Sequence, residues 1–149
     1  MDAAEYDTMA RVEDRYWWYR NLRRRIARSL RDAVATTPRR ILDVGCGTGA
    51  NVRGLRTVFP GCVVVGSDVA AQALEHARVR FHGPLVQASA NALPFRDGVF
   101  DVVLITDVLN VAAVDDAVAV HEAHRVLRAH GVLAINRSEE RRVGKECRL

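Results

Sequence analysis

The segment ILDVGCGTGANV at residues 41–52 constrains the fold of this chain more than any other feature. A short apolar run leads into three alternating glycines, Gly45, Gly47 and Gly49, and a helix-like run follows them. Glycine lets the backbone turn sharply and approach a ligand closely, and the helix that follows offers unpaired N–H groups in its first turn. A plain strand-to-helix turn would use the same glycines, so the flanking sequence has to decide between the two interpretations.

Strand-like and helix-like segments alternate from residue 40 to residue 136. This alternation is typical of a parallel sheet with helices on both faces and right-handed crossovers. We therefore predict an α/β fold, a Rossmann-like doubly wound parallel sheet, whose ligands bind at the carboxyl ends of the strands. The predicted strands cover residues 40–44, 62–67, 85–88, 100–106 and 132–136, and the predicted helices run from the glycines to about 58, over 69–80 and over 114–129.

The region before the first predicted strand has a different composition. Residues 2–19 are polar and aromatic, and residues 20–35 are predicted to form a helix. One face of that helix repeats an apolar residue every fourth position, while arginines occupy the opposite face. We expect residues 1–38 to form a helical and aromatic cap on a ligand-binding domain at 39–136, and the arginine face to be solvated rather than bound to nucleic acid.

Composition excludes several classes of protein. The 149 residues suit one domain, and 49% hydrophobic with 27% charged residues is ordinary for a globular chain. No apolar run approaches the roughly 20 residues of a membrane span, and the acidic start MDAAEYD does not resemble a signal peptide. The three cysteines show neither a disulfide framework nor metal-ligand spacing, and His121 and His124 stand one position too close for a zinc helix motif. We therefore predict a cytoplasmic protein without a metal site.

Two acidic residues indicate which ligand the glycine segment binds. Asp68 ends the second predicted strand, where an acid can accept both hydroxyls of a ribose. The glycine spacing also fits a dinucleotide fingerprint, so a nicotinamide dehydrogenase is one alternative. Asp43, two residues before the first glycine, would repel a pyrophosphate but would suit a ligand that carries an ammonium and a sulfonium. S-adenosylmethionine carries both charges and no phosphate, so the sequence favours it.

These segments resemble the class I S-adenosylmethionine-dependent methyltransferases over about residues 6–136. The central stretch is DVGCGTG with GSD at 66–68. NALPFRDGVFDVVLITDVLNV resembles the family's fourth-strand region, and EAHRVLRAHGVLAIN resembles its last helix and fifth strand. YDTMARVEDRYWWYRNLRRR resembles a subgroup that has a paired-Trp N-terminal motif.

The resemblance assigns roles in cofactor binding. It implies that Asp43 and the backbone of Gly45, Cys46 and Gly47 hold the methionine end of the cofactor, with Gly49 completing the loop. It further implies that Asp68 binds the ribose and that Val69 lies beside the adenine.

The third and fourth units follow the family pattern less closely. Ser89 and Ala90 stand where the family often has an Asp that reads the adenine amino group, and a Ser hydroxyl could accept the same bond. Thr106 and Asp107 match the floor of the methionine and substrate pocket. Asn110 and Val111 replace a frequent Glu-His pair, so no catalytic residue is assigned.

The aromatic run Tyr16-Trp17-Trp18-Tyr19 has two interpretations. It packs the N-terminal helix onto the sheet, or it forms a lid whose ring faces approach the sulfonium as cation–π partners. Tyr6, Trp17 and Arg20 are the candidate cofactor contacts from this region.

The predicted function is methyl transfer from S-adenosylmethionine to a small-molecule acceptor. A cofactor-binding fragment without turnover is the alternative, and a dehydrogenase is the less favoured one. Family members continue past the fifth strand with an antiparallel strand pair, so we expect the domain at 39–136 to be incomplete. Residues 137–147, RSEERRVGKEC, resemble a translated sequencing adapter and hold the only lysine among the 22 basic residues. We therefore expect residues 137–149 to be a non-native tail.

Overall fold

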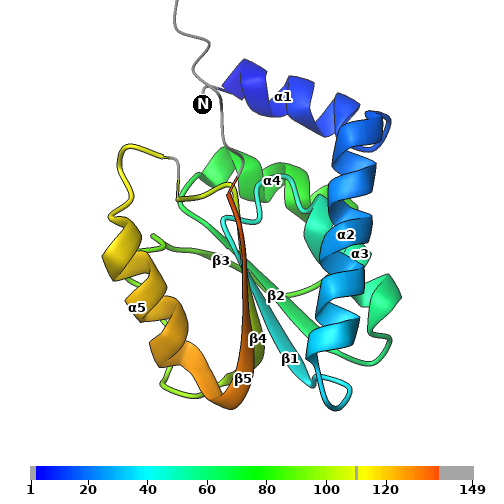
Figure 1. The fold of residues 1–149 in the computed structure, drawn as a ribbon. Helices are drawn as coiled ribbons and strands as arrows, with labels where there is room; N and C mark the ends of the chain where they lie inside the picture. The colour runs from blue at the N-terminus through cyan, green and yellow to red at the C-terminus, as the bar shows by residue number, and fades with distance from the viewer. Residues whose placement is uncertain (1–2, 110, 138–149) are drawn as a thin grey trace, which may run out of the picture.

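Figure 1 shows the computed structural model of the chain, in which residues 3–109 and 111–137 are described. Five strands form one sheet in the order β3-β2-β1-β4-β5, and all neighbouring strands run parallel. This arrangement confirms the predicted doubly wound α/β fold. The strands are β1 (Arg40–Val44), β2 (Val63–Asp68), β3 (Leu85–Gln87), β4 (Phe100–Thr106) and β5 (Leu127–Asn136).

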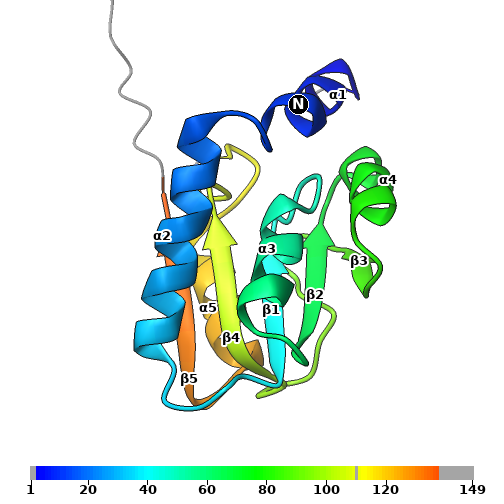
Figure 2. The ribbon, with the colours of Figure 1, turned by 90° about the vertical axis from the view of Figure 1, so that its right-hand side faces the viewer.

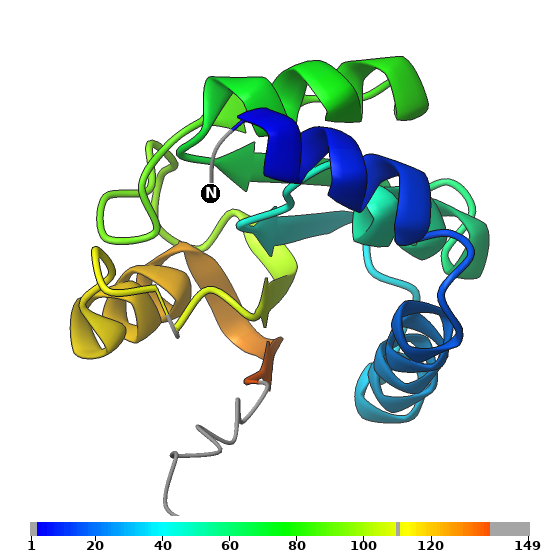
Figure 3. The same ribbon diagram turned by 90° about the horizontal axis from the view of Figure 1, so that it is seen from above.

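Helices cover both faces of the sheet (Figures 1 and 2). Three helices, α2 (Trp17–Ala33), α3 (Ala50–Val58) and α4 (Ala71–Arg80), pack on one face, and α5 (Asp116–Val126) packs on the other. The remaining helix, α1 (Ala3–Val12), lies beside α4 (Figure 3). His76 of α4 and Asp7 of α1 are 3.0 Å apart, so polar contacts join these two helices.

The inner strands β1 and β4 are buried on both faces, which explains their continuous apolar sequences. Successive residues of β1 point to opposite sides, so Ile41 belongs to the core cluster that includes Leu55 of α3, whereas Leu42 belongs to the cluster that includes Val126 of α5. In β4, every residue from Phe100 to Ile105 is buried. The sheet centre is therefore rigidly packed, and it presents the end of β1 at the middle of the carboxyl edge.

The last helix and strand differ from the prediction. The helix ends at Val126 instead of 129, and β5 begins at Leu127 instead of 132. Leu127 pairs with Phe100 ahead of a register shift in the β4–β5 ladder, so tertiary strand pairing overrides the local helical tendency. At the other end, the Asp115 side chain accepts a hydrogen bond from the Val118 N–H and caps the helix.

The N-terminal region also differs, because it forms two helices with a turn at residues 13–16 between them. The predicted helix at 20–35 begins earlier, at Trp17, and ends at Ala33. Leu30 of this helix is 1% exposed and belongs to the same core cluster as Ile41, so α2 shares the core of the sheet. The division of the chain at residue 38 stays a prediction.

Within the described ranges, no helix combines the length and the apolar character that crossing a membrane requires. Residues 138–149, which include Cys147 and nearly all of the predicted tail, lie outside the described residues, as does Asn110.

Candidate functional site

The glycine loop folds over the carboxyl end of β2. The N–H groups of Gly45 and Cys46 both donate to the carbonyl oxygen of Ser67, at 2.7 and 2.9 Å. Gly45 has a φ of 70°, and a Cβ there would overlap with the Val108 side chain. Glycine is therefore required at this position for both backbone conformation and space.

Asp43 lies at the centre of the site, on β1 between Gly66 of β2 and Leu104 of β4. Its side chain is fully buried, and neither carboxylate oxygen has a hydrogen-bond partner among the described residues. Burial, and then repulsion by Asp68, raise the pKa of Asp43 to about 8. A buried carboxylate without a partner is unfavourable, so this position suits a cationic group of a ligand. The chemistry of this orphaned carboxylate fits a cofactor that carries an ammonium and a sulfonium.

Asp68, at the end of β2, holds the glycine loop in place. One carboxylate oxygen accepts the N–H of Gly47 and the other accepts the N–H of Ala70, each at 2.9 Å. Each oxygen keeps a further lone pair, so Asp68 can shape the loop and still accept ribose hydroxyls. The neighbouring Val69 is 68% exposed and offers an open apolar surface beside this carboxylate.

The turn after β3 lies beside Asp68 because the N–H of Ala88 donates to the Asp68 carbonyl oxygen at 2.9 Å. The Ser89 hydroxyl oxygen accepts the N–H of Asn91 at 3.2 Å, which leaves it a second lone pair. Ala90 is buried in the core beneath this turn. The structure thus brings Ser89 to the same sheet edge as Asp68, as the sequence predicts.

The end of β4 forms the opposite side of the site. The buried Thr106 hydroxyl has no partner among the described residues. Asp107 adopts a φ of 55°, a left-handed conformation that few residues other than glycine adopt. Its N–H donates a hydrogen bond to the carbonyl oxygen of Asn136 at 2.9 Å. The next residue, Val108, is the one that contacts Gly45. The residues predicted to form the pocket floor therefore lie across from the glycine loop.

Cys46 is buried within the loop, and its sulfur lies beside Gly66. Burial, followed by the charges of Asp43 and Asp68, raises the pKa of the Cys46 thiol well above its usual range. The neutral thiol is a weak nucleophile, so this side chain is not suited to nucleophilic catalysis.

The three candidate cofactor contacts from the N-terminal region lie in different places in the structure. Tyr6 of α1 lies within the influence of Asp68, whose charge adds to burial in raising the pKa of the Tyr6 hydroxyl. Trp17 is 68% exposed and lines a groove with Asn136, and Arg20 lines a different groove with Ala50. The structure thus brings only Tyr6 toward the acidic end of the site, and the cofactor roles of all three residues stay predictions.

A polar cluster that no local sequence pattern predicts connects the N-terminal helices to the glycine loop. The Glu13 carboxylate is 3% exposed, and it accepts hydrogen bonds from the Thr48 hydroxyl and the Arg80 guanidinium. Arg80 also donates to Thr48 and to Asp14. Glu13 and Arg80 are 67 positions apart, and no local pattern links them.

Metal ligation has no support within the described residues, where no group of three or more His, Cys, Asp or Glu side chains could hold an ion. His121 and His124 are both exposed on α5.

Comparison with known proteins places this geometry in a family. Residues 42–135, more than half of the chain, match the family described as "Methyltransferase domain". The chain is 40% identical over 77 residues to a malonyl-[acyl-carrier protein] O-methyltransferase of Legionella pneumophila, and the match covers 49% of this chain and 27% of the relative. It is 43% identical over 82 residues to a demethylmenaquinone methyltransferase of Thermus thermophilus, covering 49% and 36% of the two chains.

Among solved structures, one from Methanococcus maripaludis that is assigned to the S-adenosylmethionine-dependent methyltransferases has a TM-score of 0.78. It is 18% identical, over 90% of this chain and 64% of that chain, so this likeness concerns the fold alone. The two curated relatives are matched over about a third of their own length, 27% and 36%.

Proposed function

Because the chain belongs to the class I S-adenosylmethionine-dependent methyltransferases, with S-adenosylmethionine as its cofactor, we propose that it transfers the cofactor's methyl group to a small-molecule acceptor. The observation that carries this proposal is the fully buried Asp43, whose carboxylate has no partner among the described residues. A pyrophosphate carries no positive charge that could balance this group, which disfavours the dinucleotide alternative.

We assign the binding roles from the positions of the side chains. Asp43 balances the cationic methionine end of the cofactor, and the backbone of Gly45 and Gly47 lines that end. The free lone pairs of Asp68 accept the ribose hydroxyls. Val69 and Ser89 lie beside that carboxylate and contact the adenine.

The cofactor supplies an activated methyl group on a positively charged sulfur. The main contribution of the protein is then alignment, which can lower a barrier by about 7–11 kcal/mol. The buried centre of the sheet fixes Asp43 rigidly, and the glycine loop is fixed by Asp68 and Ser67. Thr106 and Asp107 at the end of β4 supply the polar groups of the acceptor side.

The names of the relatives suggest which acceptors to test. One is named for a malonyl group on acyl-carrier protein and the other for demethylmenaquinone. An oxygen of a carboxylate and a carbon of a quinol ring are therefore the first two acceptor atoms to examine in this chain.

The assay incubates the chain with S-adenosylmethionine labelled in the methyl group, and with a malonyl thioester or a demethylmenaquinol analogue. We expect label to enter one of these small molecules, and the Asp43→Asn variant to transfer none. Asp32→Asn, a change on the exposed side of α2, serves as the matched control and should keep full activity. Cofactor binding without transfer to either acceptor would favour a binding fragment, and binding of NAD in its place would overturn the proposal.

A further inference from the structure

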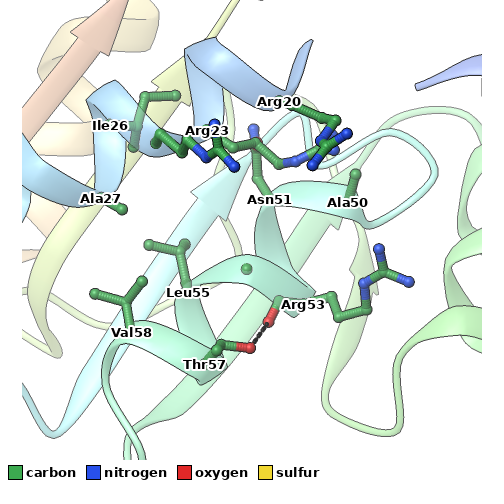
Figure 4. Close-up of a pocket in the computed structure, with 12 residues that line it drawn as sticks. Arg20, Arg23, Ile26, Ala27, Ala50, Asn51, Arg53, Leu55, Thr57 and Val58 are labelled. Atoms are coloured by element: carbon green, nitrogen blue, oxygen red, sulfur yellow. Dashed lines mark hydrogen bonds between the residues drawn. The ribbon is translucent and has the colours of Figure 1, made fainter. Parts of the chain in front are cut away.

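A pocket lies outside the candidate cofactor site, in the groove between α2 and α3 (Figure 4). Its volume is about 330 Å³, which lies at the lower end of the range of ligand pockets. Apolar side chains from both helices form its inner wall, namely Ile26, Ala27, Leu55 and Val58. The groove can therefore bury a short apolar chain.

Arginines line the other part of the groove. Arg20, Arg23 and Arg24 come from α2, and Arg53 comes from α3. The side chains of Arg20 and Arg24 are exposed and form no hydrogen bond or ion pair with any described residue. Two guanidinium groups at this groove are thus left without an internal counter-ion.

The remaining two arginines share a single carboxylate. Arg53 lies 2.8 Å from Asp14, and Arg23 lies 3.5 Å from the same residue. Burial lowers the pKa of Arg23, and repulsion by Arg53 and Arg20 adds to this effect while Asp14 opposes it. Because Asp14 also pairs with Arg80, the groove keeps an excess of positive charge.

The charged and apolar parts occupy different ends of the groove. In Figure 4, the side chains of Arg20 and Arg53 gather on the side of Ala50, where α3 begins, and Val58 lies at the far end. The first turn of α3 contains no acidic residue, so its partial positive charge adds to that of the arginines. The groove is therefore cationic where the helix starts and apolar where it ends.

We propose that this groove binds a small anionic amphiphile, in which a carboxylate or phosphate monoester is attached to a short alkyl chain. The guanidinium groups of Arg20 and Arg24 match the geometry of either anion, and Leu55 and Val58 receive the chain. The groove shares no lining residue with the candidate cofactor site at Asp43, Asp68 and the glycine loop, so the inference does not depend on methyl transfer.

The test titrates hexyl phosphate, inorganic phosphate and hexanol separately into the isotopically labelled full chain, and follows the backbone amides by NMR. We expect hexyl phosphate to shift the amides of Asn51, Gly54 and Thr57, with a Kd at least about tenfold lower than that of either fragment alone. Hexanoate in place of hexyl phosphate separates a carboxylate ligand from a phosphate ligand.

Two double variants make the test specific. Arg20→Gln with Arg24→Gln should weaken hexyl phosphate binding about tenfold or more, because charge-assisted hydrogen bonds are lost. Arg28→Gln with Arg31→Gln removes the same charge from the same helix outside the groove, and should change the Kd less than about twofold. Inorganic phosphate that binds as tightly as hexyl phosphate, equal weakening in both double variants, or shifts confined to other surfaces would each overturn the proposal.

Discussion

Two groups of side chains with opposite charge lie near the start of α3. On the sheet side, Asp43 and Asp68 are the acidic residues of the candidate cofactor site, and on the α2 side, Arg20 and Arg24 line the basic groove. The groove includes Ala50 and Asn51 at the helix start, and the candidate cofactor site includes the glycine loop that precedes them. We therefore expect the side chains around this helix start to determine the charge of the ligand on each side.

The two groups also differ in burial. Asp43 is fully buried in the sheet centre, whereas Arg20 and Arg24 are exposed. Charges interact more strongly in the protein interior than at its surface, so Asp43 should dominate cofactor affinity, while each arginine contributes modestly to the groove. The turn that contains Glu13 and Asp14 contacts both the glycine loop and the groove. The Glu13 carboxylate accepts a hydrogen bond from the Thr48 hydroxyl, and the Glu13 carbonyl oxygen accepts one from Arg23.

The largest expected effect is that of Asp43→Asn on cofactor affinity. The variant removes the negative charge that faces the cationic end of the cofactor, so we expect the Kd of S-adenosylhomocysteine to rise by about a hundredfold or more. Calorimetric titration measures this change. Hexyl phosphate affinity at the groove should stay the same, and a parallel loss at both sites would show that they are not independent.

The same variant should change the pH dependence of stability. Between pH 3.8 and about 8, Asp43 is protonated in the folded chain but ionised in the unfolded chain. The folded state then binds more protons, so its stability falls as the pH rises through this range. At about 1.4 kcal/mol per pKa unit, the cost at pH 8 is on the order of a few kcal/mol.

Urea unfolding of the parent chain and of Asp43→Asn at pH 4, 6 and 8 measures this difference. The free energies of unfolding should be similar at pH 4, and the variant should be increasingly more stable than the parent at pH 6 and pH 8. A difference that does not change with pH would mean that Asp43 is not protonated in the folded chain.

Glu13→Gln tests the turn that contacts both the glycine loop and the groove. Removing one partner of a buried ion pair costs about 3–5 kcal/mol at most, and the remaining contact of Arg80 with Asp14 should reduce this loss. We expect faster amide hydrogen exchange in α1 and weaker binding of S-adenosylhomocysteine. Glu75→Gln, at an exposed position on α4, is the matched control. Unchanged hydrogen exchange in α1 would mean that Glu13 does not anchor this helix.

The smallest effect is the contrast in salt dependence. Raising the ionic strength from about 0.05 M to about 0.5 M screens exposed charges much more than buried ones. Binding of hexyl phosphate at the groove should weaken several-fold, whereas binding of S-adenosylhomocysteine should change less than about twofold. Equal salt dependence at the two sites would contradict the difference in burial on which the comparison rests.

The parts of the molecule that the sequence predicts best are those whose structure follows from a local pattern. β1 and β4 have the predicted bounds, because strands buried on both faces need continuous apolar runs. Asp43 and Asp68 were expected at one edge of the sheet, since the carboxyl ends of adjacent parallel strands meet there. The structure places them so, next to the glycine loop.

Features that depend on distant contacts could not be predicted in this way. The early start of β5 results from the pairing of Leu127 with Phe100, which local helix propensity does not reveal. The cluster of Glu13, Thr48 and Arg80 joins three separate segments. The placement of Arg20 in a groove with Ala50, and of Trp17 in another with Asn136, likewise depends on how α2 packs against α3 and β5.

Calorimetric titration of the chain with S-adenosylhomocysteine and with NAD at pH 7, in two buffers of different ionisation enthalpy, tests the central claim most directly. If Asp43 has a pKa of about 8 and must ionise to face the ammonium, binding of S-adenosylhomocysteine releases about one proton per site, and NAD does not bind. Binding of NAD, or binding of S-adenosylhomocysteine without proton release, would contradict the role given to Asp43.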